Sequence, residues 1–471
     1  MVAYEMAEMA NYFNTTDMNQ LAVDYPIGPA FLRRFEAISH HELRALQEMR
    51  FAEVLRQAWR IPFYQRHWSA KGIEDGDIRG LDDIAKLPSF DKSDIMRSIE
   101  AHPPFGDFHG MELYEPGQRP PVIVHTTSGT TGKPQVLLYG PKSREVQNLL
   151  VARLYLLQGL RSDDIVHSVY GHGMVNGGHY LREAVVHWTN AIFLPAGTGA
   201  ETRSVQQVSM MKEFGATVLV GFADYIKHLA DVAREQGLEP GRDIPIRMIS
   251  GHMGREAVEK LSESWGGADI FDWYGVGDTG AIAGDGPERS GLYVMEDAQY
   301  LEICDIESGM PVADGESGDM INTCLFKDDI YPIIRFNTHD VSAYRTDTAP
   351  SDLKLRRIEG FLGRSDNMIK LRGINFFPQS ISGMLAERPE FTGEFICRAR
   401  RLANGRDEMT VTVEVRSGLE DAELKKLYHD LLRRKIGVEV AVEFAALGVL
   451  AELTGIETRQ KPIRLLDERF G

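Results

Sequence analysis

The chain has 471 residues, which is too long for one ordinary hydrophobic core and indicates about two or three domains. Its 69 acidic and 52 basic residues give a net charge of −17, which repels phosphate backbones and anionic lipids, so we expect neither nucleic acid nor membrane as a partner. The three cysteines form no CxxC pair, which argues against a disulfide framework. Without a basic export signal or an apolar stretch of ~18–20 residues, the expected compartment is the cytoplasm.

The predicted elements begin with helices. Residues 41–60 carry apolar side chains at helical spacing, which predicts an amphipathic helix that Pro62 ends. A short acidic helix is expected around residues 81–87. From residue 121 the pattern changes, because the runs at 121–125 and 135–139 both indicate short strands.

Strand and helix signals then alternate through the middle of the chain. Helical stretches at 146–158, 204–215 and 223–237 lie among short apolar runs that indicate strands. Such alternation predicts an α/β fold, with helices on the faces of a sheet. Residues 291–347 are rich in strand signals and predict a β-rich subdomain.

The pattern of strand and helix signals changes again near residue 363, which predicts a separate α+β unit. Strand-like runs flank the turn signal Asn404-Gly405, and residues 421–437 have the pattern of an amphipathic helix. We therefore predict an α/β fold with two parts. A large N-terminal domain, residues 1–364, contains sheets flanked by helices and the β-rich subdomain, and a small α+β domain covers residues 365–471.

A loop rich in glycine and hydroxyl residues lies between the strands predicted at 121–125 and 135–139. Glycines let backbone N–H groups approach an anion, hydroxyls add donors and lysine adds positive charge, so the loop suits a triphosphate. It is not a Walker A loop, which needs a glycine at Thr127 and a hydroxyl residue at Pro134. The candidate ATP-binding residues are Thr126, Thr127, Ser128, Gly129, Thr130, Thr131, Gly132 and Lys133.

This run, TTSGTTGKP, resembles the phosphate-binding signature of the adenylate-forming enzymes, which include acyl-CoA ligases and peptide-synthetase adenylation domains. Segments 61–68, 77–95 and 375–381 are similar to the phenylacetate–CoA ligase branch, and the resemblance covers the chain from about residue 40. It implies ATP-dependent activation of a carboxylic acid, with an aryl acid expected, to acyl-AMP and pyrophosphate. Transfer to CoA as a thioester would follow.

The resemblance also implies the nucleotide-binding residues. The segment DWYGVGD, 272–278, looks like the family's tyrosine–glycine–x–threonine/serine–glutamate motif. Tyr274 is then expected to stack on adenine and Asp278 to bind Mg²⁺ in place of glutamate. Gly277 replaces the hydroxyl residue, and Asp278 is one methylene shorter than glutamate. Either Mg²⁺ is reached through water, or Thr279 compensates, or the activity is unusual. Asp340 ends a strand similar to one in the branch, and its carboxylate is the expected ribose ligand.

The segment from Gly363 to Pro378 is the second strong match. The resemblance places the family hinge at Asp366, makes the C-terminal domain a mobile lid, and brings Arg364 to the ribose or α-phosphate. Lys461, near the chain end, aligns with the adenylation lysine, which neutralises charge as pyrophosphate leaves. The implied catalytic residues are Lys461, Lys133 and Arg364.

The acid is expected to bind between two glycine- and histidine-containing segments, 170–179 and 251–253. The candidate substrate-binding residues are Tyr170, His172, Asn176, Gly251 and His252. An ordinary loop histidine is the competing explanation for each imidazole. The expected small-molecule partners are a carboxylic acid, ATP with Mg²⁺, and CoA.

Two alternatives to the CoA ligase stay open at this level. The acyl group could pass to an amine or a carrier protein rather than to CoA. The chain could instead bind nucleotide without ligase turnover, which Gly277 and Asp278 would suit and Lys461 would not. The oligomeric state, with a homodimer as one option, does not follow from the residues.

Overall fold

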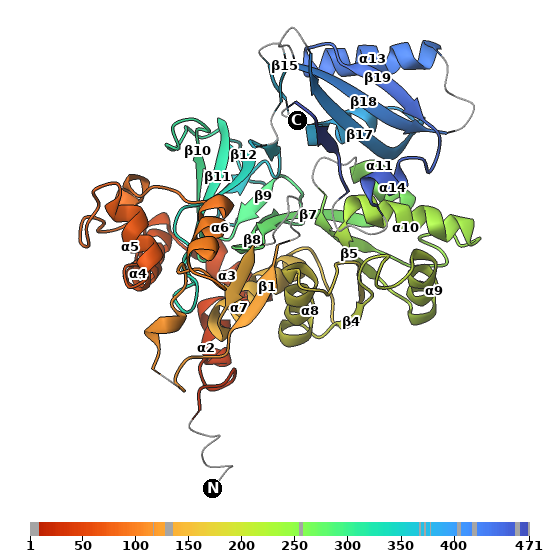
Figure 1. The fold of residues 1–471 in the computed structure, drawn as a ribbon. Coiled ribbons are helices and arrows are strands. Elements are labelled where there is room, and N and C mark those ends of the chain that lie inside the picture. The colour runs from red at the N-terminus through yellow and green to blue at the C-terminus, as the bar shows by residue number, and fades with distance from the viewer. Residues whose placement is uncertain are drawn as a thin grey trace. The chain divides into compact units, whose positions relative to one another are not determined.

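The structure is a computed structural model, shown in Figure 1. It describes residues 9–115, 117–127, 135–253, 258–366, 369–371, 374–376, 378–402, 407–416, 422–456 and 462–469. The chain divides into two compact units. The first comprises Met1–Asp163, His172–Phe193 and Trp273–Gly360, and the second comprises Asp164–Gly171, Leu194–Asp272 and Phe361–Gly471.

The first unit begins with helices. A capping box between Ser39 and Glu42 starts helix α4, which ends at Ala58. Pro62 therefore does not end that helix, as the sequence predicted, but occupies the first turn of the next one, α5, where a missing N–H costs nothing. The helices are α2 (Met18–Asp24), α3 (Gly28–Ala37), α4 (His40–Ala58), α5 (Pro62–Ser69), η1 (Leu81–Lys86), α6 (Lys92–Ala101), η2 (Met111–Leu113), α7 (Pro141–Leu157) and α8 (Asn176–Trp188).

The strands of the first unit are antiparallel. Strands β1 (Ile123–Thr126) and β2 (Val136–Tyr139) form a hairpin, as predicted. Strands β10 (Gln299–Cys304), β11 (Ser317–Cys324) and β12 (Phe336–Ala343) form the expected β-rich part. The third group comprises β8 (Gly280–Asp285), β9 (Leu292–Val294), β13 (Arg357–Ile358) and the second half of β7 (Asp269–Val276), which enters from the other unit.

The second unit contains a parallel sheet. Strands β3 (Ile165–Ser168), β5 (Val218–Phe222), β6 (Met248–His252) and the first half of β7 pair in that order. Because β5 and β6 are buried along nearly their whole length, they are apolar rather than alternating. The helices of this part are α9 (Ser204–Phe214), α10 (Ala223–Glu235) and α11 (Val258–Ser264), and β4 (Ile192–Pro195) stands next to β3 in the strand order.

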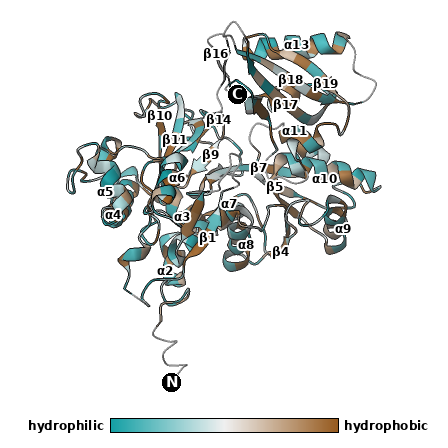
Figure 2. Cartoon of the chain, in the orientation of Figure 1, coloured by the Kyte–Doolittle hydropathy of each residue, from teal (hydrophilic) through white to brown (hydrophobic). Residues whose placement is uncertain are grey.

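The C-terminal part of the chain, from residue 361, has its own core. Helix α13 (Ala422–Ile436) lies along one face of a four-stranded sheet (Figure 1), and it carries both hydrophobic and hydrophilic residues (Figure 2). Its Leu424, Tyr428 and Leu432 are buried against the sheet. The other elements are β14 (Gly363–Arg364), β15 (Ile369–Leu371), β16 (Ile374–Phe376), η3 (Pro378–Ser380), α12 (Ile381–Leu385), β17 (Phe391–Arg401), β18 (Asp407–Val415), β19 (Ala441–Ala445), α14 (Ala451–Thr454) and β20 (Leu465–Asp467).

The predicted α/β class is confirmed, with helices and several sheets in both units. The predicted boundary between residues 364 and 365 stays a prediction. Within the described residues, none of the helices has the length and apolar character needed to cross a membrane.

Candidate active site

The base of the glycine- and hydroxyl-rich loop is a closed hairpin in the first unit. Thr127 N donates to Gln135 O at 3.0 Å, and Gln135 N donates to Thr127 Oγ1 at 3.3 Å. Thr126 N donates to Met174 O at 2.8 Å, which ties the hairpin to the start of α8. The loop itself lies outside the described residues, so the phosphate role of Ser128, Gly129, Thr130, Thr131, Gly132 and Lys133 stays a prediction.

The residues expected at adenine and ribose lie together. Tyr274, in β7, donates from its hydroxyl to Asp340 Oδ2, in β12, at 2.8 Å. Both residues are buried, at 5% and 6% exposure. A carboxylate has about four acceptor positions, so the same side chain can hold Tyr274 and accept from other donors. The two candidate residues are thus in direct contact, although their motifs are far apart in sequence.

Asp278, the expected Mg²⁺ ligand, is a buried carboxylate. Gln135 Nε2 donates to its Oδ1 at 2.6 Å and the Tyr331 hydroxyl donates to the same oxygen at 3.3 Å. Burial raises the pKa of Asp278 to about 6, against the lowering effect of nearby Lys327. Lys327 Nζ also donates to the Asp278 carbonyl at 3.0 Å. The carboxylate therefore supports the end of the phosphate-loop hairpin through Gln135.

Packing bears on the glycine at position 277, and hydrogen bonding bears on Thr279, the residue expected to compensate. A Cβ at residue 277 would lie 2.9 Å from Leu137 Cδ1, so a hydroxyl side chain there requires Leu137 to move. Thr279 is fully buried, and its hydroxyl donates to Gly280 O at 3.1 Å. Thr279 thus already uses its hydroxyl within the backbone turn, and its compensating role stays a prediction.

Two of the acid-binding candidates belong to the first unit. Asn176 is buried, accepts from the Arg144 guanidinium and donates to Tyr139 Oη at 3.1 Å, so its amide is engaged at both ends. The His172 ring meets His179 edge-on at 5.7 Å between centroids. His179 in turn lies 4.8 Å from the ring of His125.

His125 was not among the residues that the sequence predicted for the site, although it directly precedes Thr126. It is buried, and burial together with Arg144 lowers the pKa of its imidazole to about 4, so the ring is neutral at pH 7. Its Nδ1 contacts Met174 O at 3.3 Å. The only available signal was its position, next to the signature run.

The other acid-binding candidates lie at the carboxyl ends of the parallel strands in the second unit. Tyr170 follows β3, and its hydroxyl lies 2.8 Å from His252 Nδ1, at the end of β6, and 3.1 Å from Gly221 O. Phe222, at the end of β5, stacks on the His252 ring at 4.9 Å. Carboxyl ends of parallel strands are the usual place for ligands in such sheets.

The close spacing of two strands explains why residue 251 is a glycine. A Cβ there would lie 1.8 Å from the carbonyl oxygen of Gly221 on the neighbouring strand β5. No side chain fits at that separation, so the close approach of the two strands requires glycine. Its contribution to acid binding stays a prediction.

Comparison with known proteins gives a consistent family. The model described as "AMP-binding enzyme C-terminal domain" matches residues 373–469. Phenylacetate-coenzyme A ligase from Aromatoleum evansii is 29% identical over 88% of this chain and 92% of its own length, and that from Escherichia coli K12 is 26% identical over 92% and 97%. The crystal structure of 2-hydroxyisobutyryl-CoA ligase in the postadenylation state, in complex with R3-HIB-AMP, has a TM-score of 0.81 at 25% identity, covering 95% of this chain and 94% of that one.

Over most of its length the chain is similar to phenylacetate-coenzyme A ligases, and its C-terminal part matches the AMP-binding enzyme C-terminal domain. Two of the candidate residues near the start of the C-terminal part form one ion pair. Arg364 donates from Nε and Nη2 to the two oxygens of Asp366, at 2.8 and 2.6 Å. The expected nucleotide-binding arginine is therefore held by the expected hinge residue. The roles of both stay predictions.

Lys461 lies outside the described residues, so its catalytic role stays a prediction. Arg464, three positions later, is described: its guanidinium forms a two-point ion pair with Glu394 of β17, at 3.0 and 3.1 Å. Cys397 N also donates to Arg464 O at 2.9 Å, in line with the parallel pairing of β20 and β17. The segment that follows Lys461 is thus fastened to the small sheet.

Proposed function

We propose that this chain is an AMP-forming acid–CoA ligase. In the first step the oxygen of a carboxylic acid attacks the α-phosphate of ATP, the bond to pyrophosphate breaks, and acyl-AMP and pyrophosphate result. In the second step the CoA thiol attacks the acyl carbon, AMP leaves, and the thiol proton is released. The observation that carries the proposal is the buried hydrogen bond between Tyr274 and Asp340, which come from two separate signature segments and are proposed to bind the nucleoside.

Chemistry of this kind needs positioning and charge neutralisation rather than a protein nucleophile. Tyr274 offers an aromatic face for adenine and Asp340 offers acceptors for the ribose hydroxyls. Lys133 and the hydroxyls of the loop are proposed to hold the β- and γ-phosphates. Lys461 is proposed to neutralise the charge that develops at the α-phosphate, and Arg364 to contact the ribose or α-phosphate.

The residues around Asp278 fit a magnesium ion bound mainly by phosphate. Mg²⁺ in nucleotide sites keeps several waters and takes one or two protein carboxylates, and Asp278 supplies one oxygen-donor side chain beside the base of the phosphate loop. When bound, the ion would offset phosphate charge. In the described residues no cluster of three or more acidic, histidine or cysteine side chains is placed to hold a metal by itself.

For the acid we propose an aryl carboxylate. The supporting observation is the group of flat rings at the strand ends of the second unit, where Tyr170, Phe222 and His252 contact one another. Flat side chains suit a flat ligand, and the Tyr170 hydroxyl and His252 imidazole add polar groups for orientation. Since ATP and CoA are metabolites of the cytoplasm, we propose that compartment.

The test is pyrophosphate release from ATP with a panel of aryl and alkyl acids, each with and without CoA. The proposal expects release with one or more aryl acids and formation of a thioester that depends on CoA. Release without thioester would instead assign an amine or carrier-protein acceptor. ATP binding without release for any acid would leave a nucleotide-binding protein and refute the ligase. Light scattering on the same preparation tests whether the chain forms a homodimer.

A further inference from the structure

The residue before Asp340 has an unusual backbone. His339 has φ = +56°, in the left-handed region, which is uncommon for any residue other than glycine. It also lies in an irregular stretch of β12. Ile321 pairs with Asn337 and Asp319 pairs with Val341, so residues 338–340 lie opposite Met320 alone. A bulge of this kind bends a strand and redirects the side chains that follow.

Hydrogen bonds inside the bulge stabilise this conformation. His339 N donates to Asn337 Oδ1 at 2.8 Å, and Asp340 N donates to Thr338 Oγ1 at 3.1 Å. Thr338 Oγ1 itself donates to the carbonyl of Met320, the residue opposite, at 2.8 Å. The backbone turn at His339 thereby sets the direction in which Asp340 leaves the strand.

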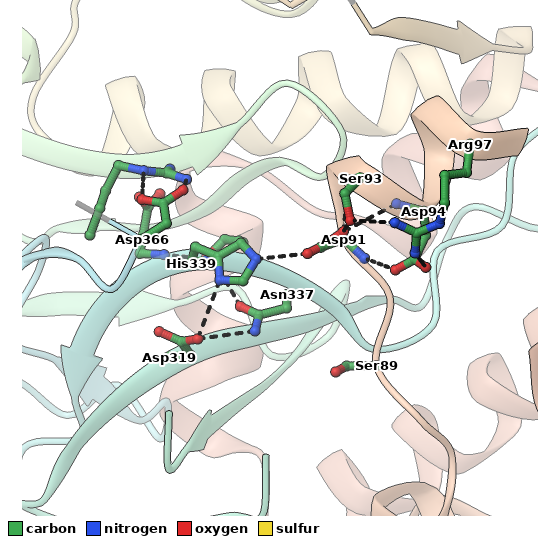
Figure 3. Close-up of polar contacts among 12 residues, drawn as sticks. Ser89, Asp91, Ser93, Asp94, Arg97, Asp319, Asn337, His339 and Asp366 are labelled. Carbon is green, nitrogen blue, oxygen red and sulfur yellow. Dashed lines mark hydrogen bonds and ion pairs between the residues drawn. The ribbon is translucent and has the colours of Figure 1, made fainter. Parts of the chain in front are cut away.

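The imidazole of His339 lies between two carboxylates from different elements (Figure 3). Its Nε2 is 2.9 Å from Asp91 Oδ2, and its Nδ1 is 3.6 Å from Asp319 Oδ2 in β11. Asn337 Nδ2 also donates to Asp319 Oδ2 at 3.0 Å. Asp319 and Asp91 raise the pKa of His339 to about 10, so the ring is cationic at neutral pH.

Asp91 is itself held rigidly. It is the N-cap of α6, where its Oδ1 accepts from Ser93 N at 2.7 Å and Asp94 N at 3.2 Å (Figure 3). The residue before it, Phe90, donates to Arg335 O, just before β12, and accepts from Asn337 N within β12. The carboxylate that meets His339 is therefore fixed by a helix start on one side and by the same strand on the other.

We propose that His339 is a positioning residue for nucleotide binding: clamped between Asp91 and Asp319, it maintains the bulge that presents Asp340 to the ribose of ATP. This inference rests on the proposed function, in which Asp340 binds the ribose. It assigns to the nucleotide site the cap of α6, for which the sequence predicted no nucleotide role. A merely structural clamp would stabilise the fold without affecting how the ribose is recognised.

The experiment measures equilibrium binding of ATP, 2′-deoxyATP and 3′-deoxyATP by calorimetry, together with thermal unfolding. The variants are His339→Asn, which tolerates the left-handed backbone but cannot carry charge, and Asp91→Asn. The matched control is Asp107→Asn. Asp107 accepts from Ser98 near the end of α6 and pairs with Arg66 of α5, so the control removes an ion pair that also contacts α6 through a hydrogen bond.

The expected result is a loss of ribose selectivity. Both clamp variants should weaken ATP binding by about tenfold, as for one charged hydrogen bond, while the deoxy analogues change little. The control should lower thermal stability and keep the wild-type ratio of ATP to deoxyATP affinity. Clamp variants that lower stability but keep this ratio would overturn the inference.

The Asp340→Asn variant separates the inference from the function on which it rests. If Asp340→Asn abolishes ribose selectivity but the clamp variants do not, the positioning role fails and the proposed site survives. If Asp340→Asn has no effect, or the wild type binds no ATP, the ribose site fails and the inference fails with it. In the Asp340→Asn background, His339→Asn should cause no further loss of selectivity.

Discussion

The Tyr274 hydroxyl donates to Asp340 Oδ2 at 2.8 Å across 66 positions of sequence, and both residues are buried. Tyr274→Phe keeps the ring but removes this donor. Hydrogen bonds to charged groups contribute about 1.5–3 kcal/mol, so we expect the KM for ATP in pyrophosphate release to rise by about tenfold or more. The KM for the acid should change little.

The control for this prediction is Tyr344→Phe. Tyr344 is also buried, and its hydroxyl donates to Leu301 O at 2.7 Å, within the first unit but away from the signature residues. Its loss should lower thermal stability by a similar amount and leave the KM for ATP unchanged. Equal effects of the two substitutions on that KM would contradict the nucleoside role of Tyr274.

The Mg²⁺ requirement should depend on Asp278. Asp278→Asn keeps the shape of the side chain and an acceptor for Gln135, but it removes the negative charge. We expect the Mg²⁺ concentration for half-maximal pyrophosphate release to rise by roughly tenfold to a hundredfold. Asp329→Asn, another buried carboxylate of the first unit, should leave this concentration unchanged. If both variants need the same Mg²⁺ concentration for half-maximal release, Asp278 is not a metal ligand.

Lys461→Ala should separate binding from chemistry. The lysine is proposed to act on charge that develops only in the transition state, so its loss should reduce the rate of pyrophosphate release by about 10²–10³-fold or more. ATP affinity should stay within a few-fold. Lys426→Ala, an exposed lysine on α13, serves as the control and should retain full turnover. Turnover that survives the first substitution would show that the lysine was wrongly assigned.

A substitution at Tyr170 should weaken binding of the acid and leave binding of ATP unchanged. Tyr170→Phe removes the hydroxyl that contacts His252 and Gly221 O. One neutral hydrogen bond is worth about 1 kcal/mol, so the KM for the preferred acid should rise by roughly fivefold, and the order of preference within the panel should change. Tyr225→Phe, a buried tyrosine of the same unit that bonds Ser204 at 2.9 Å, is the control. Indistinguishable acid panels for the two variants would argue against an acid site at Tyr170.

The clamp at His339 predicts a specific pH dependence of stability. Its pKa is raised to about 10 by Asp319 and Asp91, against an ordinary value of about 6.5. Because the pKa is higher in the folded state, the charged His339 imidazole stabilises the fold fully below about pH 6.5. This stabilisation is lost as the pH rises towards about 10. The pKa of Asp91 is lowered, mainly by His339, so its contribution persists above its ordinary value of about 3.9. The difference in melting temperature between wild type and His339→Asn should be largest near pH 6.

That difference should decline steadily on going to alkaline pH. Asp107→Asn again provides the comparison, because its carboxylate has a lowered pKa and no titration is expected between pH 6 and 10. A gap between wild type and His339→Asn that is constant from pH 6 to pH 10 would mean that the imidazole is not held in its charged form.

Local pattern in the sequence was sufficient for much of the fold. The strands on either side of the phosphate loop, the helix at α13 and the apolar strand β5 all formed where periodicity indicated them. These features depend on short-range spacing of apolar side chains, which the sequence displays directly. Pro62 was misread because a proline can either follow one helix or begin the next, and only the capping geometry distinguishes the two.

The arrangement of the site required the tertiary structure. No local pattern indicates that Tyr274 would meet Asp340, that Asp278 would be buried against Gln135, or that the cap of α6 would reach His339. Each of these contacts joins segments that are far apart in the chain, and their formation depends on strand register and on which polar groups are removed from water together. The sequence by itself determined which residue types are available for nucleotide chemistry, whereas packing decided which of them touch, because register and burial are properties of the whole fold.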